Sequence, residues 1–232
     1  MPSPTRLLWI VAALALIAAR PPQAGAQPIC PSSELRLATT NVIVSTSAAA
    51  ETTDAASGTV CLRAGYDLVA GRVRMVQCGF LSHTYAIARD AYDVIGVPSG
   101  TPVSLTVEFA LDGSVWTPGC GGAGCSGTLA GYLRHGGRTD EGVYSIHLFQ
   151  GSAEVHDVLR LPLTIVAGQP QAVEFELRGY RNPGGSHGSE GTGTIRFTGL
   201  PPGARVVSCQ GFAGQATPVR SATWGRVKTI YR

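Results

Sequence analysis

Along most of the chain, apolar and polar residues alternate with a period of two, as in a strand with one buried face. Clear examples are residues 73–78, 103–109, 143–149 and 172–178. Beyond residue 26, only the last ten residues are compatible with the spacing of an amphipathic helix over two or three turns. The pattern therefore predicts strands nearly everywhere.

Shorter or less regular segments add to this set of strands. Residues 35–44 alternate or run β-branched, and we expect one strand there. The small residues of 45–57 are compatible with an edge strand or a loop. Further strands are expected at residues 60–63, 161–166, 193–197 and 205–209.

Glycine and proline signals separate the strands and indicate turns. They lie at residues 98–102, 112–113, 135–137, 167–170, 182–185 and 200–203. The glycine-rich stretch 184–193 is expected to be a long flexible hairpin connection. This spacing is typical of an all-β fold, and we expect an antiparallel β-sandwich, jelly-roll-like, preceded by a signal helix.

The N-terminal segment has the three parts of a secretory signal peptide. Arg6 supplies the positive charge, residues 7–19 are an unbroken apolar run, and Ala24-Gly-Ala26 offers small residues before a cleavage site. The apolar run is shorter than the roughly 20 residues of a membrane span. The sequence therefore divides into a signal peptide (1–26), a β-sandwich domain (27–214) and a basic C-terminal tail (215–232), with no membrane span expected in the mature chain.

Composition narrows the function classes. The chain has 18 Lys and Arg against 15 Asp and Glu. Without Arg6 and Arg20 the mature part has 16 against 15, a net charge of +1. Nucleic-acid binding would require a strongly basic face, so no nucleic-acid partner is expected.

Six cysteines in an exported chain favour three disulfides. We pair Cys120 with Cys125 across a short flexible loop, Cys61 with Cys78 across a hairpin, and Cys30 with Cys209 as the remaining two. The alternative is a metal cluster, but the intervals are irregular and no Cys-x-x-Cys occurs. No metal is therefore expected at the cysteines.

Two stretches of the chain resemble a known family. Residues 86–114 contain Gly100-Thr-Pro-Val-Ser-Leu105 and end in Ala110-Leu-Asp-Gly-Ser114, and residues 161–212 hold a matching order of strands and turns. Over roughly residues 34–212 the chain resembles exported bacterial β-sandwich proteins of the PEP-CTERM type. The resemblance implies a secreted or surface protein associated with exopolysaccharide or biofilm matrix. The chain contains no Pro-Glu-Pro motif, so the anchor of that family is not expected.

Charge is unevenly distributed along the chain. Residues 191–232 carry six basic residues and no acidic one, whereas residues 27–190 carry a net charge of −5. The tail either packs on its own domain or docks on an anionic partner in the cell envelope. The candidate docking residues are Trp224, Arg226, Lys228, Tyr231 and Arg232.

The chemical candidates do not form a catalytic pattern. His135, Asp140, Glu141, His147 and His156 are close in sequence, but no His-x-His pair occurs. The Ser, His and Glu of residues 186–190 are too local for a rigid triad. Trp116 is interpreted either as a sugar-stacking or as a core residue. No catalytic residue, metal or cofactor is therefore assigned.

The preferred interpretation is a non-catalytic exported protein, a structural or adhesive component of the bacterial cell surface or extracellular matrix. Its expected partner is an envelope or matrix polysaccharide or a surface protein, and its expected location is secreted or cell-surface, with the periplasm as an alternative. A carbohydrate-binding module is the second interpretation, although tryptophans are few. A secreted hydrolase or metal-dependent enzyme is the third and the least favoured.

Overall fold

A computed structural model describes residues 30–37, 41–54, 62–79, 83–117, 125–148, 151–181 and 187–214. Every regular element in these ranges is a β-strand, and no helix there is long and apolar enough to cross a membrane. The strands are β1 (Ser33–Leu37), β2 (Asn41–Ser45), β3 (Ala49–Asp54), β4 (Leu62–Asp67), β5 (Arg72–Gly79), β6 (Thr84–Ile95), β7 (Pro102–Thr117), β8 (Cys125–His135), β9 (Arg138–Leu148), β10 (Gly151–Val166), β11 (Gln171–Arg181), β12 (His187–Thr198) and β13 (Arg205–Ser208).

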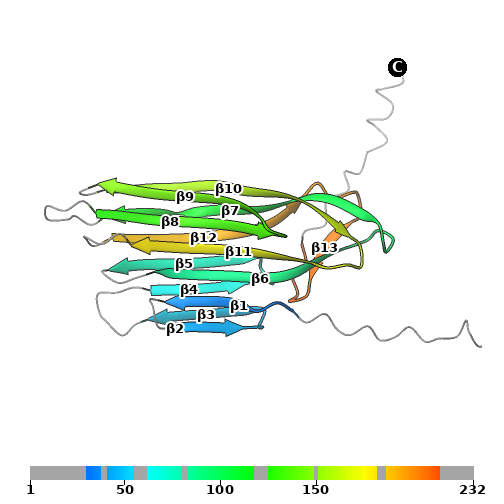
Figure 1. The fold of residues 1–232 in the computed structure, drawn as a ribbon, viewed down its shortest axis with the longest axis horizontal. Helices are drawn as coiled ribbons and strands as arrows, with labels where there is room; N and C mark the ends of the chain where they lie inside the picture. The colour runs from blue at the N-terminus through cyan, green and yellow to red at the C-terminus, as the bar shows by residue number, and fades with distance from the viewer. Residues whose placement is uncertain are drawn as a thin grey trace, which may run out of the picture.

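The strands form two antiparallel sheets that face each other (Figure 1). Sheet A has the order β2-β1-β6-β11-β8-β9, and β13 also pairs with β6. Sheet B has the order β10-β7-β12-β5-β4-β3. The predicted antiparallel β-sandwich is confirmed.

The strands β5 to β12 follow the order of a jelly roll. Counted along the chain, the first, eighth, third and sixth of these strands are neighbours in sheet B. The second, seventh, fourth and fifth are neighbours in sheet A. The earlier strands extend this unit: β1 and β2 continue sheet A beyond β6, and β4 and β3 continue sheet B beyond β5.

Strand alternation builds the core between the sheets. In β11, Val173, Phe175 and Leu177 point inward and are fully buried, while the residues between them lie on the outer face. Phe175 packs against Phe109 of β7, with ring centroids 5.4 Å apart. Each such side chain contributes about 1.5–3 kcal/mol by leaving water. The apolar positions of the alternating pattern therefore hold the two sheets together.

Residues 35–44 are not one strand, as the sequence predicted, but parts of two. β1 and β2 run antiparallel, and Glu34 lies opposite Val44. The apolar run suggested continuity, yet Val44 is 64% exposed because β2 lies at the edge of sheet A. Of the two alternatives for residues 45–57, the edge strand is confirmed in part, since β3 forms the edge of sheet B.

The predicted turn at Asp112-Gly113 is wrong, because both residues lie within β7. A Cβ added at Gly113 would lie 2.2 Å from the carbonyl oxygen of Glu190 on β12. Glycine is therefore required here for a close approach of two strands, a role that sequence alone does not distinguish from a turn.

The glycine-rich stretch 184–193 is also not simply a loop, because β12 begins at His187. Gly188 lies under the ring of Trp116, and Gly193 lies under the ring of Phe109. An added Cβ would come within 2.1 Å of the first ring and 2.0 Å of the second. Gly193 makes room for Phe109 inside the sandwich, and Gly188 makes room for Trp116 on the outer face of sheet B, since the adjacent Val115 faces the core.

Other predicted turns are confirmed. Gly136 and Gly137 have φ values of 54° and 78° and connect β8 to β9, as in a two-residue hairpin turn that requires positive φ at both central positions. The signals at 167–170 and 200–203 likewise lie between strands.

The predicted disulfide between Cys30 and Cys209 is confirmed. Cys30 precedes β1 and Cys209 follows β13. Both of these strands pair with β6, at different positions along its length. Beside the bridge, the buried carboxylate of Asp90 accepts hydrogen bonds from the backbone N–H groups of Ala91 and Gln210. The bridge therefore fastens the two segments that share one side of β6.

Several expectations fall outside the described residues. They are the signal peptide 1–26, the sulfur atoms of Cys61, Cys78, Cys120 and Cys125, the side chain of His147, and the tail with Trp224, Arg226, Lys228, Tyr231 and Arg232.

Candidate ligand-binding face

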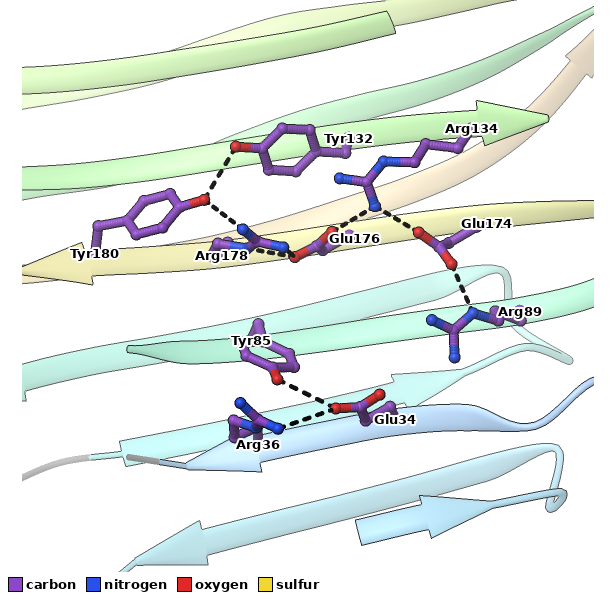
Figure 2. A network of polar contacts seen from close by, with 10 residues as sticks. All are labelled: Glu34, Arg36, Tyr85, Arg89, Tyr132, Arg134, Glu174, Glu176, Arg178 and Tyr180. Carbon is purple, nitrogen blue, oxygen red and sulfur yellow. Dashed lines mark hydrogen bonds and ion pairs between the residues drawn. The ribbon is translucent and has the colours of Figure 1, made fainter. Parts of the chain in front are cut away.

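Charged and tyrosine side chains gather on the outer side of sheet A, over β1, β6, β11 and β8. We call this set the polar face. Figure 2 shows its ten residues: Glu34, Arg36, Tyr85, Arg89, Tyr132, Arg134, Glu174, Glu176, Arg178 and Tyr180.

Strand β11 supplies the middle of the polar face through its period of two. Glu174, Glu176, Arg178 and Tyr180 occupy every second position and point away from the core, because the intervening residues face it. The neighbouring strands add residues by the same rule. Each strand alone is an ordinary half-buried strand, and only their pairing assembles the polar face.

Ion pairs connect one end of the polar face. Arg89 on β6 donates from Nε to Glu174, with a distance of 2.6 Å. Arg134 on β8 donates from Nη1 to both glutamates of β11, and its distance to Glu176 is 2.6 Å. Glu176 is fully buried although it lies on the outer face, since guanidinium groups cover it.

The same chain of contacts continues to the tyrosines. Arg178 donates to Glu176 and, from Nη1, to the hydroxyl of Tyr180 at 2.6 Å. The hydroxyls of Tyr180 and Tyr132 are hydrogen-bonded at 3.1 Å. An unbroken line of polar contacts therefore runs from Arg89 to Tyr132 across three strands (Figure 2).

Guanidinium groups also stack on the tyrosine rings. Arg134 lies 4.5 Å from the ring centroid of Tyr132, and Arg178 lies 5.3 Å from that of Tyr180. Such cation–π contacts contribute about 0.5–1 kcal/mol each at partly exposed sites. Together with the ion pairs they hold the side chains in fixed positions before any ligand arrives.

A second group lies beside this line, around Tyr85. Arg36, Tyr85 and Arg178 are direct neighbours across β1, β6 and β11. The hydroxyl of Tyr85 donates to Glu34 at 3.2 Å. A hollow of about 430 Å³ opens here, lined by Glu34, Arg36, His83, Tyr85, Ile87, Arg178 and Tyr180.

The electrostatics keep the polar face charged. Burial raises the pKa of Glu174, but hydrogen bonds and charges from Arg89 and Arg134 outweigh it and hold that pKa below its usual value. Burial, followed by the hydrogen bond with Tyr180, raises the pKa of Tyr132 to about 12. At neutral pH this carboxyl is therefore ionised and this phenol keeps its proton.

The residues singled out as chemical candidates lie elsewhere. His135 contacts the carbonyl oxygen of Ala172 at 2.8 Å, and His156 contacts Asp112 on sheet B at 2.8 Å. Asp140 accepts a hydrogen bond from the backbone of Arg160 at 2.6 Å. In the described ranges, these and other His, Cys, Asp and Glu residues form no group of three that would hold a metal ion.

Trp116 is half-buried in β7 and lies over Gly188, so its ring packs against a neighbouring strand. Because the adjacent Val115 faces the core, the alternation of β7 places Trp116 on the outer face of sheet B, which does not favour the core interpretation. The polar face, in contrast, was not identified from the sequence. Its signal is the run Glu-x-Glu-x-Arg-x-Tyr over residues 174–180, where every outer position of one strand carries a charge or a phenol.

Comparisons with known proteins give little. No family model matches the chain, and no curated protein matches it. One similar solved structure is TmCBM61 in complex with beta-1,4-galactotriose, at 10% sequence identity. The match covers 63% of this chain and 86% of the other, with a TM-score of 0.20. A likeness this weak carries no argument about the present chain.

Proposed function

We propose that the protein is a non-catalytic, exported component of the bacterial cell surface or matrix that binds polysaccharide through the polar face. The observation that carries this proposal is the fixed array in which three tyrosines, four arginines and three glutamates share one side of sheet A.

The chemistry of the polar face suits sugars. A sugar ring offers hydroxyl groups that both donate and accept hydrogen bonds, and apolar C–H faces that pack on aromatic rings. Glu34 and Glu174, whose side chains are 22% exposed, are acceptors, the arginines are donors and the tyrosine hydroxyls are both. Because contacts such as the one between Tyr132 and Tyr180 already position these groups, little side-chain freedom is lost on binding.

Export is supported by the disulfide between Cys30 and Cys209, because such bonds persist in oxidising compartments. The signal-peptide pattern of residues 1–26 supports it independently. A protein outside the cytoplasm with a sugar-binding face suits adhesion to an envelope or matrix polymer. The periplasm remains the alternative location.

The test is binding of the full chain to a glycan array, followed by affinity electrophoresis in gels that contain the polymers bound. The double variant Tyr132→Ala, Tyr180→Ala removes two rings of the polar face. We expect a loss of at least about tenfold in affinity, the size typical of a deleted binding aromatic.

The matched control is Arg63→Ala, which removes an exposed ion pair with Glu51 on sheet B. This variant is expected to bind like the unmodified chain, and circular dichroism verifies that all variants are folded. If the chain binds no glycan, or if the tyrosine variant binds as well as the control, the proposal is wrong.

A further inference from the structure

We infer that the hollow around Tyr85 takes the carboxylate of an acidic sugar, so that the preferred ligand is a uronate-containing polysaccharide. This inference rests on the proposed function and names its substrate class. It starts from Arg36, whose donors are poorly used within the fold.

Arg36 has the weakest ion pair of the polar face. Its Nη2 lies 3.9 Å from the carboxylate of Glu34, whereas Arg89 and Arg134 lie 2.6 Å from their glutamates. Its Nε is buried and has no hydrogen-bond partner among the described residues. A buried donor without a partner is unfavourable, so the fold does not pair this guanidinium fully. The side chain as a whole is 38% exposed, so a ligand reaches its exposed part and not the buried Nε.

Glu34 does not compensate Arg36 fully, because it has another partner. The Oε1 atom that faces Arg36 also accepts the hydrogen bond from the Tyr85 hydroxyl at 3.2 Å. The polar face as a whole carries four arginines against three glutamates. The one positive charge in excess therefore belongs most directly to Arg36.

The geometry around Tyr85 suits a planar anion. The guanidinium of Arg36 lies 4.9 Å from the Tyr85 ring centroid, and that of Arg178 lies 5.6 Å from it. Both arginines also line the same hollow of about 430 Å³. This volume is within the usual range for small-ligand sites, about 300–1,000 Å³.

A carboxylate is favoured over a sugar hydroxyl because the fork of a guanidinium matches its two oxygens. The tyrosine rings beside the hollow then meet the apolar faces of neighbouring sugar units. A neutral sugar would leave the excess charge of Arg36 uncompensated. The site therefore selects for acidic sugars within a polymer.

The experiment compares polygalacturonate with its methyl-esterified form, which has the same backbone without the charge. Isothermal titration calorimetry on the full chain is expected to show at least about tenfold tighter binding of the free acid, as for a gained charge-assisted contact. The variant Arg36→Gln should lose this preference and bind the free acid about as tightly as it binds the ester. Arg36→Lys, which keeps the charge without the fork, should retain only part of the preference. Arg63→Ala on sheet B is the control and should keep it entirely.

Dextran sulfate and dextran complete the panel. Equal binding of the acid and the ester, or an unchanged preference in Arg36→Gln, overturns the inference and leaves the proposed function intact. Binding of dextran sulfate as tight as that of polygalacturonate overturns the selection for carboxylates and shows a general affinity for anions. Binding of none of these polymers or of any arrayed glycan overturns the inference and the proposed function together.

Discussion

Single residues of the polar face depend on their neighbours for charge as well as position. Glu176 has an exposed fraction of 0%, a state that an ionised carboxylate tolerates only with close partners. Arg134 and Arg178 supply them, and Arg134 is shared with Glu174. Removal of one glutamate therefore leaves guanidinium groups without their counter-ion. Protonation of a glutamate has a similar effect, so the stability of the fold should depend on pH.

Glu174 gives a direct test of this coupling. Its pKa is held below the ordinary value of 4.5, so its ionised form stabilises the fold above that pH. The stabilisation is lost as the pH falls through the lowered pKa. We expect the difference in unfolding free energy between the unmodified chain and Glu174→Gln to be largest at about pH 7 and to shrink towards about pH 3.

Urea unfolding at a series of pH values measures this difference. Thr192→Ala on sheet B introduces no titrating group, and its difference from the unmodified chain should be the same at every pH. A constant difference for Glu174→Gln as well would contradict the role assigned to Glu174.

At the scale of elements, the alternating pattern predicted the strands and their buried faces, because both depend on local sequence. The period of two identified strands and the buried faces of residues such as Phe109 and Phe175, since alternation alone decides which side chains face the core. The paired glycines, not the alternation, indicated the β8–β9 turn, where both have positive φ. The sandwich follows from many such strands with apolar faces.

The order of the strands was not accessible in the same way, because it depends on contacts between distant segments. Arg36, Tyr85 and Arg178 are neighbours on adjacent strands although about 50 and 90 residues separate them in the sequence. A hydrophobic pattern fixes which way each side chain faces but not which strand lies beside it. The polar face was missed for this reason.

Glycines in β12 were misinterpreted for a related reason, and one of them gives a prediction. Gly193 lies directly under the Phe109 ring, so a methyl group at that position has no space. Gly193→Ala should lower the unfolding free energy by about 1–3 kcal/mol, the usual cost of overpacking a core.

Thermal and urea unfolding report this change, and the neighbouring Thr192→Ala on the outer face is expected to stay within about 0.5 kcal/mol. Unchanged stability of Gly193→Ala would mean that the ring of Phe109 moves aside at little cost.

At the scale of the whole molecule, the disulfide joins the residues that precede the first described strand and follow the last one. The sequence separation between Cys30 and Cys209 is 179 residues, and all the described strands lie between them. A bond that closes so long a loop restricts the unfolded chain strongly. Its contribution should therefore exceed that of any single contact on the polar face.

The double variant Cys30→Ser, Cys209→Ser should lower the unfolding free energy by about 2–5 kcal/mol. Unfolding of the unmodified protein and of the variant in guanidinium chloride, under oxidising conditions, measures the loss. The polar face is expected to keep its ligand affinity at temperatures where the variant stays folded, since neither cysteine belongs to it. A loss below about 0.5 kcal/mol would show that contacts such as those of Asp90 hold β1 and β13 beside β6 without the bond.

The same bond decides how the molecule responds to mechanical tension. A pull on the chain before Cys30 and after Cys209 passes through the two sulfur atoms, so the strands between them carry none of it. Reduction of the disulfide would transfer the force to the strands and allow the chain to extend by up to roughly 600 Å. An oxidised molecule held by both ends is thus nearly inextensible, and its sheets stay folded under a force that would otherwise pull them apart.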